Sequence, residues 1–157
     1  MENFSPTWGP SIDGGATLTR MAHRIYLVDD DRFLLDLYTT KFKSVGEEVT
    51  AFTGAEELLE ELRKDAGGAA AAPDAILVDL IMPGMDGFTL LETMKKEGLA
   101  KGAKLIILSN EGADAEIERA RALGVDGYIV KASAIPSEVL AEVIRTIDTT
   151  APQATPP

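Results

Sequence analysis

The sequence predicts an α/β protein with a doubly wound parallel sheet of five strands and five covering helices. Short apolar runs rich in β-branched residues alternate with longer segments whose apolar residues recur at helical spacing. Two of the short runs, "AILV" at 75–78 and "LIIL" at 105–108, are continuously apolar, which indicates strands buried on both faces. With 157 residues and 45% hydrophobic content, the chain is long enough for one such domain.

The first two strand–helix units lie in the first part of this pattern. Residues 24–28, "RIYLV", are expected to form a strand because of their β-branched and aromatic bias. Residues 32–45 are expected to form a helix, since their apolar positions are three, four and seven apart, and Gly46 ends it. A weaker strand at 48–52 and a helix at 54–64, with leucines along one face, complete the second unit.

The remaining three units follow the same alternation. Strands are expected at 75–79, 104–109 and 127–130, and helices at 87–97, 114–123 and 136–147. Asp86 is placed to cap the helix at 87–97, and Gly124 ends the next helix. Pro136 suits the first position of the last helix, because its fixed φ favours a helix start.

Charge and composition exclude several classes of protein. The net charge of −11 and the pI near 4.5 repel a phosphate backbone and argue against a nucleic-acid partner. The chain has no cysteine, so it has neither disulfides nor thiolate metal sites. No apolar run has a membrane-spanning length and no signal peptide is recognisable, so we expect a cytoplasmic protein without a membrane partner.

Both ends of the chain differ in composition from the alternating region. Residues 1–22 scatter Pro, Gly, Ser and Thr without period and are expected to be a flexible extension. Residues 149–157, "TTAPQATPP", are expected to be a disordered Pro-rich tail. The domain itself is therefore expected to span residues 23–148.

Polar residues end four of the expected strands. The acidic run 29–31 follows the first strand, Asp79 ends the third, Ser109 the fourth and Lys131 the fifth. In a doubly wound sheet, ligands bind at the carboxyl ends of the strands, so these side chains are expected to meet there. Carboxylates brought together repel one another by about 4 kcal/mol per pair at 4 Å, which calls for a cation such as Mg²⁺.

Each of these residues alone has an ordinary explanation. An acidic run is usually a solvated loop, a single lysine is usually on the surface, and a serine can cap a turn. Their agreement in order and position favours a shared site instead. A cation, an ammonium and a hydroxyl around one carboxylate are suited to phosphoryl transfer, with Asp79 as the nucleophile.

The blocks "YLVDDD", "LVDLIMPGMDG", "IILSN" and "GYIVK" match, in order, those of a known family. Over residues 23–148 the chain resembles the receiver domain of two-component response regulators, in its stand-alone, chemotaxis-receiver-like form. The resemblance implies a flavodoxin-like fold with strand order 2-1-3-4-5. It also implies a single-domain response regulator in phosphorelay signal transduction, which is a phosphoacceptor and not an enzyme, apart from self-catalysed phosphorylation and dephosphorylation.

The resemblance assigns roles to residues at the strand ends. Asp79 becomes the phosphoacceptor, and Ser109 and Lys131 contact the phosphoryl group. Mg²⁺ is held by Asp29, Asp30, Asp79 and the backbone carbonyl of Ile81. The family usually has proline after the lysine, where this chain has Ala132, so the geometry of the Lys131–Ala132 bond is left open.

Signal output is implied to occur through a switch in the surface. Phosphorylation draws Ser109 inward and changes the rotamer of Tyr128, which remodels the face of the fourth helix, fifth strand and fifth helix. A histidine kinase or histidine phosphotransfer protein would supply the phosphoryl group. A downstream protein would read the face, and a homodimer through the same face is also expected.

Other functions are weighed against this one. A haloacid-dehalogenase-like phosphatase would use Asp29 as its nucleophile, but it leaves Asp79 without a role, and the final acidic motif is missing. A flavodoxin-like electron carrier needs a hydroxyl- and glycine-rich phosphate loop where this chain has acids. A receiver that only docks, without phosphorylation, conflicts with the complete set of acids, hydroxyl and lysine.

Overall fold

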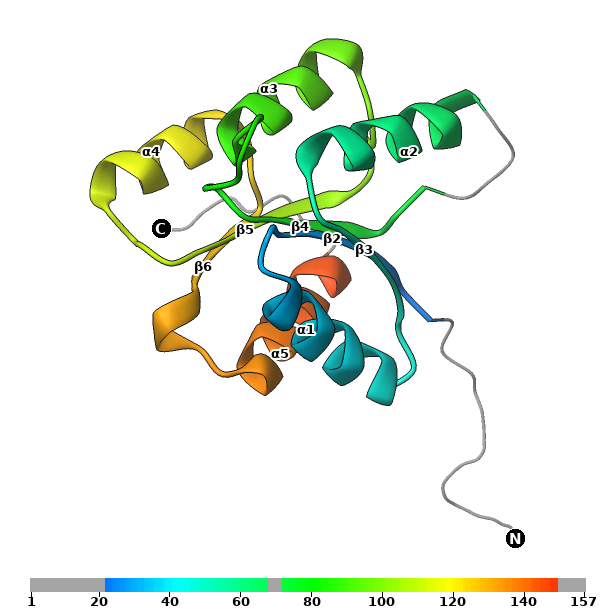
Figure 1. The fold of residues 1–157 in the computed structure, drawn as a ribbon, viewed down its shortest axis with the longest axis vertical. Helices are drawn as coiled ribbons and strands as arrows, with labels where there is room; N and C mark the ends of the chain where they lie inside the picture. Colours follow the sequence, from blue (N-terminus) through cyan, green and yellow to red (C-terminus); the bar gives the residue numbers. More distant parts are fainter. Residues whose placement is uncertain (1–21, 68–71, 150–157) are drawn as a thin grey trace, which may run out of the picture.

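The computed structural model describes residues 22–67 and 72–149. Within them, a parallel sheet of five strands carries helices on both faces, as expected (Figure 1). Nearly all of the expected flexible extension (1–22) and Pro-rich tail (149–157) lies outside the described residues.

The sheet has the strand order β3-β2-β4-β5-β6, which is the order 2-1-3-4-5 along the chain. Its strands are β2 (Arg24–Val28), β3 (Glu48–Phe52), β4 (Ala75–Val78), β5 (Lys104–Ser109) and β6 (Gly127–Val130). All four pairings are parallel. The chain passes from β2 to β3 on one side and then to β4 on the other side of β2. The carboxyl ends of β2 and β4 therefore border the ligand position of this fold class.

Five helices cover the two faces of the sheet. They are α1 (Arg32–Ser44), α2 (Ala55–Gly67), α3 (Gly87–Glu97), α4 (Asp114–Ala122) and α5 (Pro136–Asp148). Helices α1 and α5 lie on one face and α2, α3 and α4 on the other (Figure 1). A short 3-10 helix, η1 (Lys131–Ser133), joins β6 to the loop before α5.

Strand residues alternate between two hydrophobic cores because successive side chains point to opposite faces of a sheet. Tyr26 and Val28 pack in the core beneath α2, α3 and α4, whereas Ile25 and Leu27 pack in the core beneath α1 and α5. Burial on both faces explains why the central strands are continuously apolar.

Local signals in the sequence set several element boundaries. Asp86 caps α3, as expected, since its carboxylate accepts a hydrogen bond from the amide of Thr89 at 2.8 Å. Gly98 ends α3 in the left-handed region at φ 69°. Helix α2 runs to Gly67, three residues further than expected, and β4 stops at Val78, so Asp79 is the first residue after its strand.

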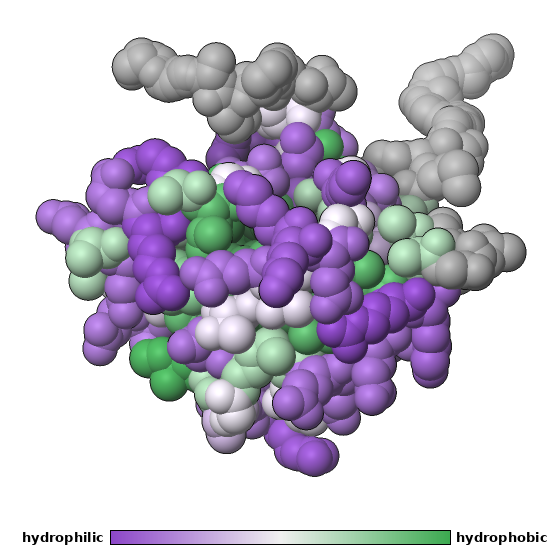
Figure 2. All heavy atoms as spheres, turned by 90° about the horizontal axis from the view of Figure 1, so that it is seen from above, coloured by the Kyte–Doolittle hydropathy of each residue, from purple (hydrophilic) through white to green (hydrophobic). Residues whose placement is uncertain are grey.

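The surface on the side of α2, α3 and α4 is largely hydrophilic, with apolar residues in small patches between charged ones (Figure 2). Within residues 22–67 and 72–149, none of the helices combines the length and the apolar character that crossing a membrane requires.

Candidate functional site

The register of the central strands brings two acids together. Val28 of β2 lies opposite Val78 of β4, and each strand ends there. The next residues are Asp29 and Asp79, and the amide of Asp79 donates a hydrogen bond to the carbonyl of Val28 at 3.1 Å. Both acids are therefore fixed by the sheet itself rather than by a loop.

Three carboxylates gather at this point. One oxygen from each of Asp29, Asp30 and Asp79 lies within 4.8 Å of the others. Asp29 is 1% exposed and Asp79 6%, whereas Asp30 is exposed to solvent. The expectation that these acidic side chains meet at one edge of the sheet is confirmed, and this cluster is termed the carboxylate pocket.

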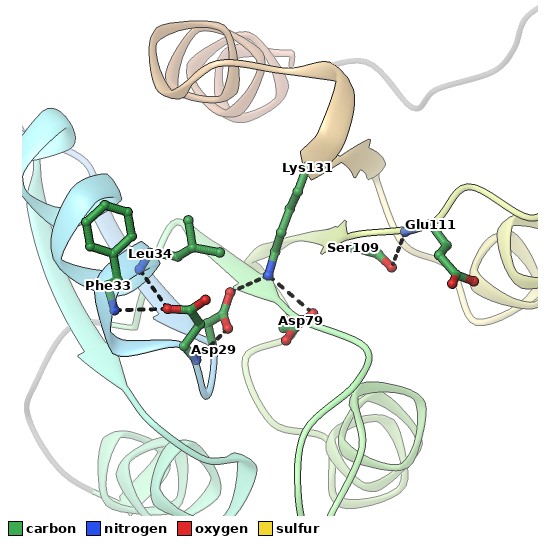
Figure 3. A network of polar contacts seen from close by, with 8 residues as sticks. Asp29, Phe33, Leu34, Asp79, Ser109, Glu111 and Lys131 are labelled. Carbon is green, nitrogen blue, oxygen red and sulfur yellow. Dashed lines mark hydrogen bonds and ion pairs between the residues drawn. The ribbon is translucent and has the colours of Figure 1, made fainter.

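Lys131 reaches this cluster from the end of β6. Its Nζ lies 2.6 Å from Oδ2 of Asp29 and 3.5 Å from Oδ1 of Asp79 (Figure 3). The lysine side chain is 7% exposed. The bond from Lys131 to Ala132 is trans, because the described chain has no cis peptide, so the ammonium reaches the pocket without the proline that the family usually has.

Burial and charge both act on the ionisation of the pocket. Burial, followed by the charge of Asp29, raises the pKa of Asp79 to about 6, although Lys131 opposes the shift. For Lys131, burial favours the neutral amine, but the hydrogen bond to Asp29 and the nearby carboxylates outweigh it, so the net pKa is raised. The lysine is thus a fixed positive charge, and the charged form of Asp79 would be stabilised by a cation bound nearby.

Asp31 has a role that the acidic run did not reveal. Its carboxylate does not join the other three but caps α1, accepting hydrogen bonds from the amides of Phe33 and Leu34 at 3.0 and 3.2 Å. Its own amide donates to Oδ1 of Asp29 at 2.9 Å. An acid immediately before an expected helix is an N-cap signal and identifies this role.

Ser109 and Tyr128 are each hydrogen-bonded to the backbone of Glu111. The hydroxyl oxygen of Ser109, which is 1% exposed, accepts a hydrogen bond from the amide of Glu111 at 3.3 Å (Figure 3). The hydroxyl of Tyr128 donates to the carbonyl of Glu111 at 2.7 Å. Burial also raises the pKa of Tyr128, so the phenol stays a donor at neutral pH. The sequence places Glu111 beside the site, two residues after Ser109, but it does not indicate this role, because the backbone of Glu111 makes both contacts.

The remaining predicted ligand, Ile81, lies in the loop after β4. Its side chain is 65% exposed. No contact of the described residues tests its backbone carbonyl as a ligand, and that assignment stays a prediction.

The donor set fits a hard divalent cation. Mg²⁺ prefers oxygen ligands and is usually held by one or two carboxylates with several waters, and this pocket offers three carboxylates, one of them open to solvent. Asp29, Asp30 and Asp79 are the side chains that can hold the ion.

Comparison with known proteins assigns the family. The model of the response regulator receiver domain matches residues 25–145. The chain belongs to this family. Receiver domains are signalling proteins of two-component systems, not classical enzymes, and they generally bind Mg²⁺ at an acidic pocket. In this chain, acidic side chains cluster at the ends of β2 and β4.

Similar receiver domains occur in proteins of different architecture. The chemotaxis protein CheY of Treponema pallidum is 31% identical over 128 residues, covering 80% of this chain and 84% of CheY. The two-component response regulator ORR1 of Oryza sativa is 32% identical over 124 residues, covering 76% of this chain and 52% of ORR1. The chain spans about half the length of the regulatory protein VanRc of Enterococcus gallinarum (49%) and of the transcriptional regulator CssR of Bacillus subtilis (56%).

Solved receiver structures share the fold. A CheY-like receiver domain protein from Methanospirillum hungatei superimposes with a TM-score of 0.70 at 27% identity, covering 81% of this chain and 94% of that one. CheY4 of Vibrio cholerae, at 24% identity, also gives a TM-score of 0.70 over 81% of this chain and 99% of its own. The flavodoxin-like receiver fold is thereby confirmed.

Proposed function

We propose that this receiver domain accepts a phosphoryl group on Asp79, with Mg²⁺ bound beside it, and passes the signal to a protein partner. The observation that carries the proposal is the pocket itself, in which three carboxylates lie within 4.8 Å of one another beneath the ammonium of Lys131. Phosphoryl transfer depends on positioning and charge neutralisation, and this pocket supplies both.

Asp79 is the acceptor because its carboxylate is buried and lies within reach of two positive charges, the ammonium of Lys131 and the proposed Mg²⁺. A carboxylate oxygen of Asp79 attacks phosphorus, the P–N bond of a phosphohistidine on the donor breaks, and the imidazole leaves with the electron pair and takes a proton from solvent. Asp29, Asp30, Asp79 and the backbone carbonyl of Ile81 would hold Mg²⁺, and the ion would neutralise charge on the transferring oxygens. Lys131 and Ser109 bind the phosphoryl oxygens.

The arrangement of Glu111 supports an output step. The serine hydroxyl now accepts from the amide of Glu111, but a phosphoryl group on Asp79 offers it a strong acceptor. When Ser109 turns to donate to that group, the amide of Glu111 loses its hydrogen bond, and Tyr128 is hydrogen-bonded to the carbonyl of the same residue. We therefore propose that Tyr128 changes position and remodels the face formed by α4, β6 and α5.

The partners follow from this chemistry. A histidine kinase or a histidine phosphotransfer protein supplies the phosphoryl group, and a downstream protein or a second copy of the chain binds the α4-β6-α5 face. Self-catalysed phosphorylation from small donors and self-catalysed dephosphorylation belong to the same proposal. We propose residues 23–148 as the functional domain, which agrees with the match at 25–145.

The experiment is incubation of the chain with Mg²⁺ and acetyl phosphate, followed by intact mass and amide hydrogen exchange. We expect one phosphoryl adduct on the wild type, none on Asp79→Asn, and altered exchange across residues 109–131. Beryllofluoride, which mimics the phosphoryl group, should change the same amides in the wild type.

Two other outcomes would replace this proposal. Repeated turnover of a phosphate ester that is lost in Asp29→Asn but kept in Asp79→Asn would indicate the phosphatase alternative. A wild type that takes up no phosphoryl group and shows no Mg²⁺-dependent change in stability would indicate a receiver that acts by docking alone.

A further inference from the structure

A groove of about 430 Å³ lies at the amino-terminal edge of the sheet, opposite the carboxylate pocket. It is bounded by the end of α3, the loop from Gly98 to Ala103, the start of β5 and the end of α4. The carboxylates lie at the opposite edge of the sheet, after β2 and β4, so the two sites do not share residues.

The floor of the groove is apolar. Leu91 and Met94 of α3 and Leu99 of the following loop are buried, and Leu105 and Leu123 are half-buried. A ligand that covers the two half-buried leucines gains hydrophobic free energy without disturbing the core. The groove therefore favours a partner with at least one large apolar side chain.

The rim of the groove is cationic. Lys95, Lys101 and Lys104 line it, and none of them forms an ion pair with any residue in the described part of the chain. Five arginines, by contrast, each pair with a glutamate: Arg24, Arg63, Arg119, Arg121 and Arg145. Four of the chain's eight lysines fall within residues 94–105. Cationic charge is thus concentrated at one groove.

The neighbouring helix end and the acid on the lining already have other hydrogen-bond partners than these ammonium groups. Helix α3 ends with its last carbonyls already bonded, since the amide of Gly98 donates to Lys95 and the amide of Leu99 to Met94. The one acid on the lining, Asp126, accepts a hydrogen bond from the amide of Leu105 at 2.8 Å. The lysine charges remain available to a ligand.

We propose that this groove docks an acidic peptide segment of a partner protein, with one large apolar side chain on the leucine floor and flanking carboxylates on the lysine rim. Charge complementarity decides the class of partner, because a chain with a net charge of −11 repels acidic segments over most of its surface. This docking surface lies at the opposite edge from Asp79, so a partner bound there leaves the carboxylate pocket open.

The test uses three short peptides added to the isotope-labelled full chain, with amide chemical shifts recorded by NMR. The peptides are Asp-Glu-Leu-Phe-Glu-Asp, its basic counterpart Lys-Arg-Leu-Phe-Lys-Arg, and Asp-Glu-Ser-Ser-Glu-Asp, which lacks apolar residues. We expect saturable shifts confined to residues 91–105 and 123–126 with the first peptide and at least fivefold weaker binding with the other two.

Variants test the rim and the floor separately. Lys95 and Lys101 are exposed, so the double variant Lys95→Glu, Lys101→Glu should keep the fold and weaken peptide binding at least fivefold. Changing both lysines to arginine keeps the positive charge and should leave peptide binding unchanged. Gly102 lines the groove and an added Cβ there meets nothing within 4 Å, so Gly102→Leu should fill the groove and also weaken binding. Lys41→Glu with Lys43→Glu on α1 is the matched charge control.

Asp79→Asn should bind the acidic peptide as the wild type does, which separates this proposal from the phosphoacceptor proposal. Absence of saturable shifts in the groove, equal binding of the basic peptide, or unchanged binding in the Lys95→Glu, Lys101→Glu variant would each overturn the docking surface.

Discussion

Tyr128 and Glu111 are joined by a hydrogen bond of 2.7 Å from the tyrosine hydroxyl to the glutamate carbonyl. The amide of the same residue donates a hydrogen bond to the hydroxyl of Ser109, so one loop residue connects Ser109 to Tyr128 of β6. A change in the position of the Ser109 hydroxyl can therefore reach the α4-β6-α5 face through two hydrogen bonds.

Tyr128→Phe removes the hydroxyl and keeps the ring. We expect a loss of about 1 kcal/mol in the free energy of unfolding, because one hydrogen bond is lost. Phosphoryl uptake from acetyl phosphate should stay unchanged, whereas the beryllofluoride-dependent exchange of residues 109–131 should shrink. An unchanged exchange response in this variant would show that the hydroxyl takes no part in output.

Asp79→Asn should stabilise the metal-free protein at neutral pH. The raised pKa of Asp79, about 6, means that folding disfavours its charged form, a cost absent below pH ~4 and complete above pH ~6. The variant should gain on the order of 2–3 kcal/mol at pH 7.5 but only about 1 kcal/mol at pH 4.5, as measured by urea unfolding in chelator. A gain that does not depend on pH would contradict this origin.

Mg²⁺ should reverse this difference in stability, so that the wild type becomes more stable than Asp79→Asn. An ion that binds the folded wild type adds stability in proportion to the logarithm of its concentration. Asp79→Asn lacks one of the three carboxylates and should gain less from the ion. Thermal unfolding in chelator and in millimolar Mg²⁺ measures the difference, and equal shifts would place the ion elsewhere.

Lys131→Met should destabilise the metal-free protein. Removing the ammonium leaves Asp29 and Asp79 buried without a partner, which costs about 3 kcal/mol or more. Mg²⁺ should restore part of this loss, because it supplies the missing positive charge. Lys43→Met, an exposed lysine on α1, is the control and should change stability by less than about 1 kcal/mol.

Gly87→Ala should displace the backbone at Asp79, the proposed phosphoacceptor. A Cβ at Gly87 would lie 2.5 Å from the carbonyl oxygen of Asp79 and 2.9 Å from Cα of Leu80, so α3 or the strand end must move. We expect a loss of about 1–3 kcal/mol and slower phosphoryl uptake. Gly102→Ala, where the added Cβ meets nothing within 4 Å, should keep stability within about 1 kcal/mol and leave uptake unchanged.

Sequence patterns predicted the strands well because burial on both faces leaves a continuous apolar run with a polar residue at its end. The limits of β2, β3, β5 and β6 are as expected, and β4 is one residue shorter. Helix ends were predicted less well: the second helix was expected to end at residue 64, but α2 continues to Gly67.

The sequence predicted which residues lie at the same edge of the sheet, but not which of their side chains are in contact. Strand order brings Asp29, Asp79 and Lys131 to one edge, but it does not show that the ammonium lies nearer to Asp29. The bond between Tyr128 and Glu111 depends on the path of a loop and on a rotamer, and neither leaves a periodic pattern in the sequence.

The ion pair between Lys131 and Asp29 joins residues 102 positions apart in the chain. Lys131 is added during synthesis only after the residues of all five strands have been made, whereas Asp29 directly follows the first of them. A nascent or truncated chain that stops before η1 holds the acids without their counter-charge. Under the proposed function, the site is complete only once the whole sheet has been synthesised, so an unfinished domain should not divert phosphoryl groups from an upstream donor.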